Sequence, residues 1–198
     1  MNPFSRFAFA TLCGLVLAII THLATILMIP LFSERHAAAR LAESARLENA
    51  KLIAGPGHET WLPRHDPAIA VAACAYDLAE GPFRFTAGTN APFQSVSLHS
   101  RGAGAFFAVT DRAAINSELD IVVMTPEQRN QVIALRALQT ETDAEPKEQD
   151  PAIEVIAPES RGFAVIRVLA PRPSLAGRAL AAARQASCTI APIEDLES

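Results

Sequence analysis

Residues 93–124, FQSVSLHSRGAGAFFAVTDRAAINSELDIVVM, carry the clearest secondary-structure pattern in the chain. Side chains alternate from Phe93 to Ser100, which is the period of a strand with one face buried. Compact apolar runs follow at 106–109 and 119–124. A Gly-rich turn at 101–104 separates the alternating stretch from the first of these runs. Short connections favour antiparallel pairing, so this stretch predicts an antiparallel meander.

Helical patterns flank these strands. Asp66-Pro67 is typical of a helix start, and apolar residues at helical spacing follow it. We therefore predict helices at 67–78, 125–138 and 174–186, further strands at 83–86, 153–156 and 163–169, and a hairpin turn at 158–162. Together these elements predict the α+β class, with a mainly antiparallel sheet of about six strands packed against three helices.

A long uncharged apolar run precedes this domain. From Phe7 to Phe32 the sequence contains no Asp, Glu, Lys or Arg. A helix of that length spans about 39 Å, and a bilayer core needs about 30 Å, so we expect a retained membrane anchor. The alternative is a cleaved signal peptide, whose apolar region is usually about 7–15 residues long.

Changes in composition divide the chain. We predict a short basic tail at 1–6, the transmembrane anchor at 7–32, a helical stalk and linker at 33–66, the α+β domain at 67–190 and a tail at 191–198. The linker contains Trp61. We expect Trp61 to cap the domain core, and the alternative is a place at the membrane interface.

The charges beside the anchor leave its orientation open. Only Arg6 precedes it, whereas four Lys or Arg follow it, up to Lys51. The positive-inside rule therefore favours a cytoplasmic domain. A short basic tail before a long apolar run is also typical of a signal-anchor, which exports the domain that follows.

One face of the anchor carries small residues. Ala10, Gly14 and Ala18 are spaced by four, and His22 continues the row. Small side chains let a second helix approach closely, so a membrane-protein partner or a homodimer through the anchor is one interpretation. The other is that Ala and Gly are simply common in membrane helices.

The chain has three cysteines. Cys13 lies in the apolar run, whereas Cys74 lies in the predicted first helix of the domain and Cys188 at the end of the predicted last helix. An exported domain would join this pair in a disulfide, and a cytoplasmic one would leave two buried thiols. The sequence has no C-x-x-C motif and no Cys/His cluster, so we expect no metal and no cofactor.

One weak polar cluster is a candidate for chemistry. If the two strands pair across the turn, His99 and Arg101 could lie beside Asp111 and Arg112. The alternative is ordinary cross-strand pairing on a solvated face, with Arg112 as a salt-bridge node. The motifs G-x-S-x-G, G-x-G-x-x-G and H-E-x-x-H are absent, so the prediction leans away from an enzyme. The net charge of -4 argues against nucleic acid as a partner.

Several stretches resemble a known family. They are CAYDL at 74–78, FQSVSL at 93–98, FFAVTDRA at 106–113 and VIRVLAP at 165–171. Together with the anchor they resemble short membrane proteins of alphaproteobacteria, grouped with the domain of unknown function family numbered 1254 and related to the family numbered 1214. Thr110-Asp111-Arg112 stands where the pattern has Asn-Asp-Arg. The resemblance implies an inner-membrane protein with an envelope-facing domain and a cysteine pair, and it implies no catalytic residue.

Three functional hypotheses follow. The first is a single-pass inner-membrane protein that presents a periplasmic α+β domain as an envelope accessory or interaction module, in contact with membrane lipid. The second is a periplasmic small-molecule binding domain with an apolar pocket lined by Phe83, Phe85, Phe106 and Phe107. The third is an enzyme that uses His99, Arg101 and Asp111.

Overall fold

The structure is a computed structural model that describes residues 2–44, 48–101, 104–142 and 152–196. It divides into two units, Met1–Ala39 and Arg40–Ser198. From Pro3 onward, the first unit lies in one helix, α1 (Pro3–Ser44). Its segment Pro3–Ile29 has a mean hydropathy of 2.5, and among the described residues it is the one helix long and apolar enough to cross a membrane. Its large apolar side chains are exposed, as a span surrounded by lipid requires.

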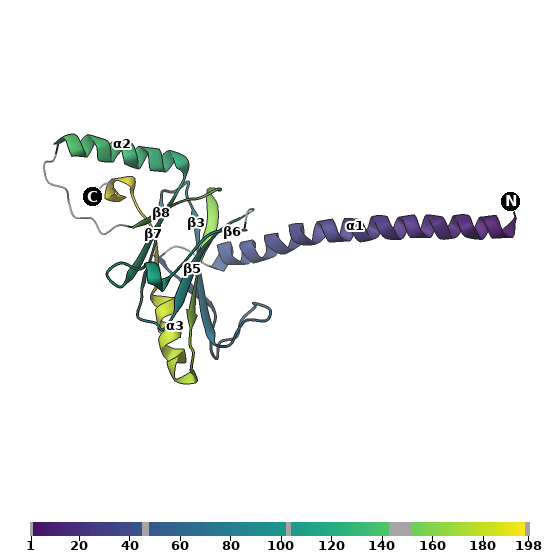
Figure 1. Cartoon of the computed structure of the whole chain (residues 1–198), viewed down its shortest axis with the longest axis horizontal. Coiled ribbons are helices and arrows are strands. Elements are labelled where there is room, and N and C mark those ends of the chain that lie inside the picture. Colours follow the sequence, from purple (N-terminus) through teal and green to yellow (C-terminus); the bar gives the residue numbers. More distant parts are fainter. Residues whose placement is uncertain (1, 45–47, 102–103, 143–151, 197–198) are drawn as a thin grey trace. The chain divides into compact units, whose positions relative to one another are not determined.

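The second unit contains two five-stranded sheets in its described part (Figure 1). Sheet A has the order β1 (Glu48–Asn49), β10 (Ser187–Ile190), β4 (Phe83–Gly88), β7 (Glu118–Met124) and β8 (Ile153–Ile156). Sheet B has the order β2 (Lys51–Ala54), β3 (Ile69–Asp77), β9 (Arg161–Leu169), β5 (Gln94–Ser100) and β6 (Gly104–Thr110). All neighbours are antiparallel except β7 and β8, which are parallel. The predicted α+β class is confirmed, with its strands divided between two sheets instead of one.

The main core lies between the two sheets. Alternate residues of β4 point into it, so Phe83 and Phe85 are fully buried, and Tyr76 stacks on Phe83 with ring centroids 4.9 Å apart. Strand β7 beside β4 and the facing strands of sheet B contribute aliphatic side chains that are also fully buried: Ile121 and Val123 from β7, and Val96, Leu98, Ile166 and Val168 from sheet B.

Helix α2 (Pro126–Thr142) begins where the sequence predicts. The Gln128 backbone N–H donates to Thr125 Oγ1 at 3.2 Å, and the Thr125 backbone N–H donates to Gln128 Oε1 at 2.9 Å, so the two residues form a capping box. Val132 of α2 packs with Val122 and Met124 on the other face of sheet A. Leu196 of the turn η3 (Ile193–Leu196) joins this second cluster, so the predicted tail is partly packed.

The predicted helix at 67–78 is wrong, because this segment forms strand β3. Asp66 accepts a 2.8 Å hydrogen bond from the backbone N–H of Ala68, so the expected helix cap closes a turn instead. Ala73 is buried against Leu41, at the end of α1, and Val165 on the outer face of sheet B. Both faces of β3 are therefore covered, and an apolar run without alternation results.

Three further predictions need correction. The turn at 158–162 is not a hairpin, because β8 belongs to sheet A and β9 to sheet B. Residues 51–54, expected in the linker, form β2 and pair with β3. The last helix is α3 (Ala176–Gln185), which follows the turn η2 (Pro173–Leu175) and ends before Cys188. The first two errors follow from pairing between residues distant in sequence, which local pattern does not record.

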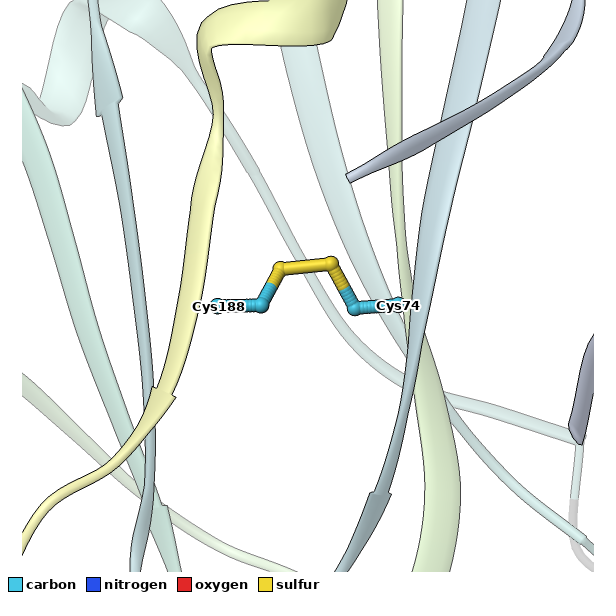
Figure 2. Close-up of a disulfide and its surroundings, with 2 residues drawn as sticks. All are labelled: Cys74 and Cys188. Atoms are coloured by element: carbon cyan, nitrogen blue, oxygen red, sulfur yellow. A yellow bond between two sulfur atoms is a disulfide. The ribbon is translucent and has the colours of Figure 1, made fainter. Parts of the chain in front are cut away.

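A disulfide joins the two sheets (Figure 2). Cys74 lies in β3 of sheet B and Cys188 in β10 of sheet A, with Cα atoms 6.5 Å apart and a sequence separation of 114 residues. Both residues are fully buried. The predicted pair is confirmed, but it joins two strands and not two helices. Cys13 is free and exposed on α1.

Candidate functional site

The structure splits the predicted polar cluster into two groups. His99 pairs with Ala105 across the β5–β6 hairpin, whereas Thr110 pairs with Ser95 near the opposite end. Asp111 and Arg112 follow Thr110 in the turn η1 (Asp111–Ala113). Ser95 and His99 are four residue steps apart along β5, which separates the two levels by about 13 Å. Arg101 stays at the end that holds His99, so an enzyme built on His99, Arg101 and Asp111 loses its geometric basis.

His99 instead belongs to a hydrogen-bonded network on the outer face of sheet B. Its Nε2 lies 3.0 Å from Ser97 Oγ, and Arg167 Nη1 donates to the same Ser97 oxygen at 2.8 Å. Phe163 stacks on the imidazole, with ring centroids 4.8 Å apart. The register of β5 and β9 places all four side chains on one face, which makes them the candidate site.

Burial and a nearby positive charge favour the neutral form of the His99 imidazole in this network. Burial, and then the positive charge of Arg167, lower the pKa of His99. Since Ser97 Oγ already accepts from Arg167, its hydroxyl can donate to His99 Nε2. Ser97 is only 9% exposed, so a substrate carbonyl has little access to this hydroxyl. The arrangement suits a proton-sensitive structural network better than a nucleophile.

Sequence reasoning missed three members of this group: Ser97, Phe163 and Arg167. The alternation of 93–100 does place Ser97 and His99 on one face, so that part of the signal was present. Phe163 and Arg167 come from a strand more than sixty residues away, and only the register of β9 against β5 brings them close.

A second polar group lies where β3 ends. Arg161 Nε donates to Asp77 Oδ2 at 2.7 Å, and the backbone N–H of Ala79 donates to Asp77 Oδ1 at 3.1 Å. The Ala79 hydrogen bond, and then that of Arg161, lower the pKa of Asp77. Burial, and then the charge of Glu159, raise the pKa of Tyr76. Asp77, Glu159 and Arg161 border an open hollow of about 500 Å³ together with Arg101.

The four phenylalanines expected to line one apolar pocket do not line a common pocket. Phe83 and Phe85 are sealed in the core, and Phe107 packs against that core. Phe106 borders an open hollow of about 680 Å³, whose wall also includes Ile156 and Pro158. Within the described part of the chain, no group of three or more His, Cys, Asp or Glu side chains is placed to hold a metal.

The four residues of the predicted helix-packing face lie in α1. Ala10, Gly14, Ala18 and His22 are exposed, and a Cβ added at Gly14 would meet no atom within 4 Å. The face is therefore open to a second helix in the structure.

Comparison with known proteins adds information on the fold alone. No family model matches the chain, and no curated protein matches it. The crystal structure of the VPA0106 protein from Vibrio parahaemolyticus superposes with a TM-score of 0.52 at 12% identity, over 79% of this chain and 33% of that one. An uncharacterized protein from Burkholderia cenocepacia gives a TM-score of 0.44 at 12% identity, over 83% of this chain and 42% of that one. The chain thus spans less than half the length of either.

Proposed function

We propose that this chain is a single-pass inner-membrane protein that holds its α+β domain in the periplasm as an envelope accessory or interaction module. The observation that carries the proposal is the buried Cys74–Cys188 disulfide, which follows an apolar helix of membrane-spanning length. Disulfides persist in oxidising compartments and are rare in the cytosol, so the pair favours export over the literal charge count. We further propose that the chain belongs with the family numbered 1254, whose pattern the stretches quoted above resemble.

The proposal extends to partners. Membrane lipid surrounds Pro3–Ile29, and the face formed by Ala10, Gly14, Ala18 and His22 packs against a helix of a partner or of a second copy. Self-association or a co-purifying membrane protein after gentle extraction supports this part. A chain that is monomeric and alone under those conditions contradicts it.

The state of the two domain cysteines tests the export of the domain. Cells that express the full chain with Cys13→Ala are quenched with acid, denatured and treated with a mass-tagged thiol reagent, with and without prior reduction. We expect Cys74 and Cys188 to be labelled only after reduction.

A variant that combines Cys13→Ala with Cys188→Ala is the matched control, because its single remaining thiol must be labelled without reduction. Labelling of both cysteines without reduction in the Cys13→Ala chain would refute export. A cytoplasmic domain, as the positive-inside rule favours, would then be the better description.

A further inference from the structure

Exposed arginines lie on helix α3 and on the loop beside it. Residues 40–198 carry fifteen Lys or Arg against twenty Asp or Glu, yet the stretch from Ser160 to Ile193 holds five arginines and no acidic residue. Two of the five have partners elsewhere in the domain, because Arg161 pairs with Asp77 and Arg167 donates to Ser97. Helix α3 lies in this stretch, and Figure 1 shows it at the opposite end of the domain from α2. Its Arg178 and Arg184 are exposed, on the side of the helix away from the buried Ala179 and Ala183.

The loop between β2 and β3 extends this surface. Arg184 Nη2 lies 2.9 Å from His58 Nε2, which ties α3 to the loop. Three residues further on, Trp61 is exposed and does not cap the core as predicted, and the Arg40 guanidinium carbon lies 5.5 Å from the centre of its ring. The same loop carries exposed Arg64. We call this surface the basic face and define it by Arg40, His58, Trp61, Arg64, Arg178 and Arg184.

Two acidic side chains accompany the arginines of the loop and of α3. The loop contains two exposed carboxylates, Glu59 and Asp66. Asp66 accepts the backbone N–H of Ala68. Arg64, Arg178 and Arg184 outnumber these two carboxylates, on a domain whose total charge is negative.

Chain connectivity limits how far this face can lie from the membrane. Arg40 follows Ile29, the last residue of the apolar span, by eleven residues. A stretch of that length reaches at most about 40 Å. The headgroup layer occupies about 5–8 Å outside the hydrocarbon, and charges act over about 8 Å at physiological salt. The short connection therefore lets the domain bring Arg40 and Trp61 to the headgroups.

We propose that the basic face binds the anionic headgroup surface of the membrane that α1 spans. Arginines attract anionic lipid, and an exposed Trp is the residue type that settles at the membrane–water interface. The anchor keeps the local concentration of the surface high, so a weak contact is enough. This inference rests on the membrane anchor of the proposed function and adds the ligand that the domain meets.

Trp61 is the single tryptophan of the chain, so it reports on this contact directly. The full chain is reconstituted in phosphatidylcholine vesicles, with or without about 30% phosphatidylglycerol, and a lipid quencher is placed at headgroup depth. We expect roughly twofold stronger quenching of Trp61 fluorescence in the anionic vesicles, reversed by about 0.5 M NaCl.

Arg178→Glu combined with Arg184→Glu should reduce the quenching to the level seen in phosphatidylcholine alone. The matched control is Arg112→Glu combined with Arg129→Glu, which makes the same charge change at exposed positions in η1 and α2. Equal quenching in both vesicle types overturns the proposal, and so does an equal loss with both double variants. Shielding of Trp61 in native membranes but in neither vesicle type assigns the face to a protein and also overturns it.

Flotation separates failure of this inference from failure of the proposed function. A chain that does not float with either kind of vesicle at high salt lacks the anchor, which refutes the proposed function. A chain that floats with both while Trp61 remains unquenched refutes only the lipid contact.

Discussion

At the residue scale, His99 is the side chain whose chemistry depends most on its surroundings. It is half-buried between Phe163 and Ser97, and Arg167 lies close enough to disfavour a second positive charge. The folded domain therefore holds this imidazole in its neutral form more strongly than the unfolded chain does. A group whose pKa differs between the folded and unfolded states makes the free energy of unfolding depend on pH.

We expect the free energy of unfolding to fall as the pH drops below about 6.5, the ordinary pKa of histidine. The pKa of His99 is lowered in the fold, so the unfolded state binds the proton first and acid favours unfolding. Chemical denaturation of the full chain in detergent at pH 7.5 and pH 5.5, about one unit to either side of that pKa, measures the loss.

His99→Gln should reduce this pH dependence, and His65→Gln, in the loop between β2 and β3, is the matched control. If His99→Gln retains the full pH dependence of the unmodified chain, another group carries the effect.

At the element scale, most strands were predicted from the sequence, whereas β3 was predicted as a helix. The stretches 83–86, 153–156 and 163–169 fall within β4, β8 and β9. Segment 67–78 failed because Ala72, Ala73 and Cys74 are all buried, so the spacing of its apolar residues fits a helix as well as a strand. His99 could be found from its own strand, whereas its partner Arg167 needed the register of another.

Strand β9 also contains a position that accepts only glycine. A Cβ at Gly162 would collide with the Tyr76 ring and with the His99 backbone oxygen. We expect Gly162→Ala to lower the free energy of unfolding by about 1–3 kcal/mol, because neither neighbour can move without disturbing the sheet.

Gly177→Ala is the matched control, since a Cβ there meets nothing within 4 Å in helix α3. It should raise stability by about 0.5–1 kcal/mol through helix propensity. Denaturant midpoints of the two variants check both signs, and a Gly162→Ala chain as stable as the unmodified one would contradict the assigned contact.

At the scale of the whole molecule, the disulfide is a covalent link between two sheets that also meet through the apolar core. It closes a loop that contains most of the domain, from β3 to β10. A cross-link over such a distance removes much conformational freedom from the unfolded chain.

Replacing both Cys74 and Cys188 by alanine should therefore lower the free energy of unfolding by about 4–5 kcal/mol in the chain-entropy model. The double replacement avoids leaving one reactive thiol in the core. Cys13→Ala is the control and should leave the denaturation midpoint of the domain unchanged. A double variant within about 1 kcal/mol of the unmodified chain would show that packing alone sets its stability.

The position of β10 has a consequence for folding during synthesis on the ribosome. This strand lies inside sheet A, between β1 and β4, yet it is the last of the ten strands along the described chain. A ribosome adding about 5–20 residues per second needs roughly 6–23 s to travel from Cys74 to Cys188. Throughout that interval sheet A lacks an inner strand, and Cys74 lacks its disulfide partner Cys188. The nascent domain therefore depends on the chaperones and oxidants that it meets before β10 is made.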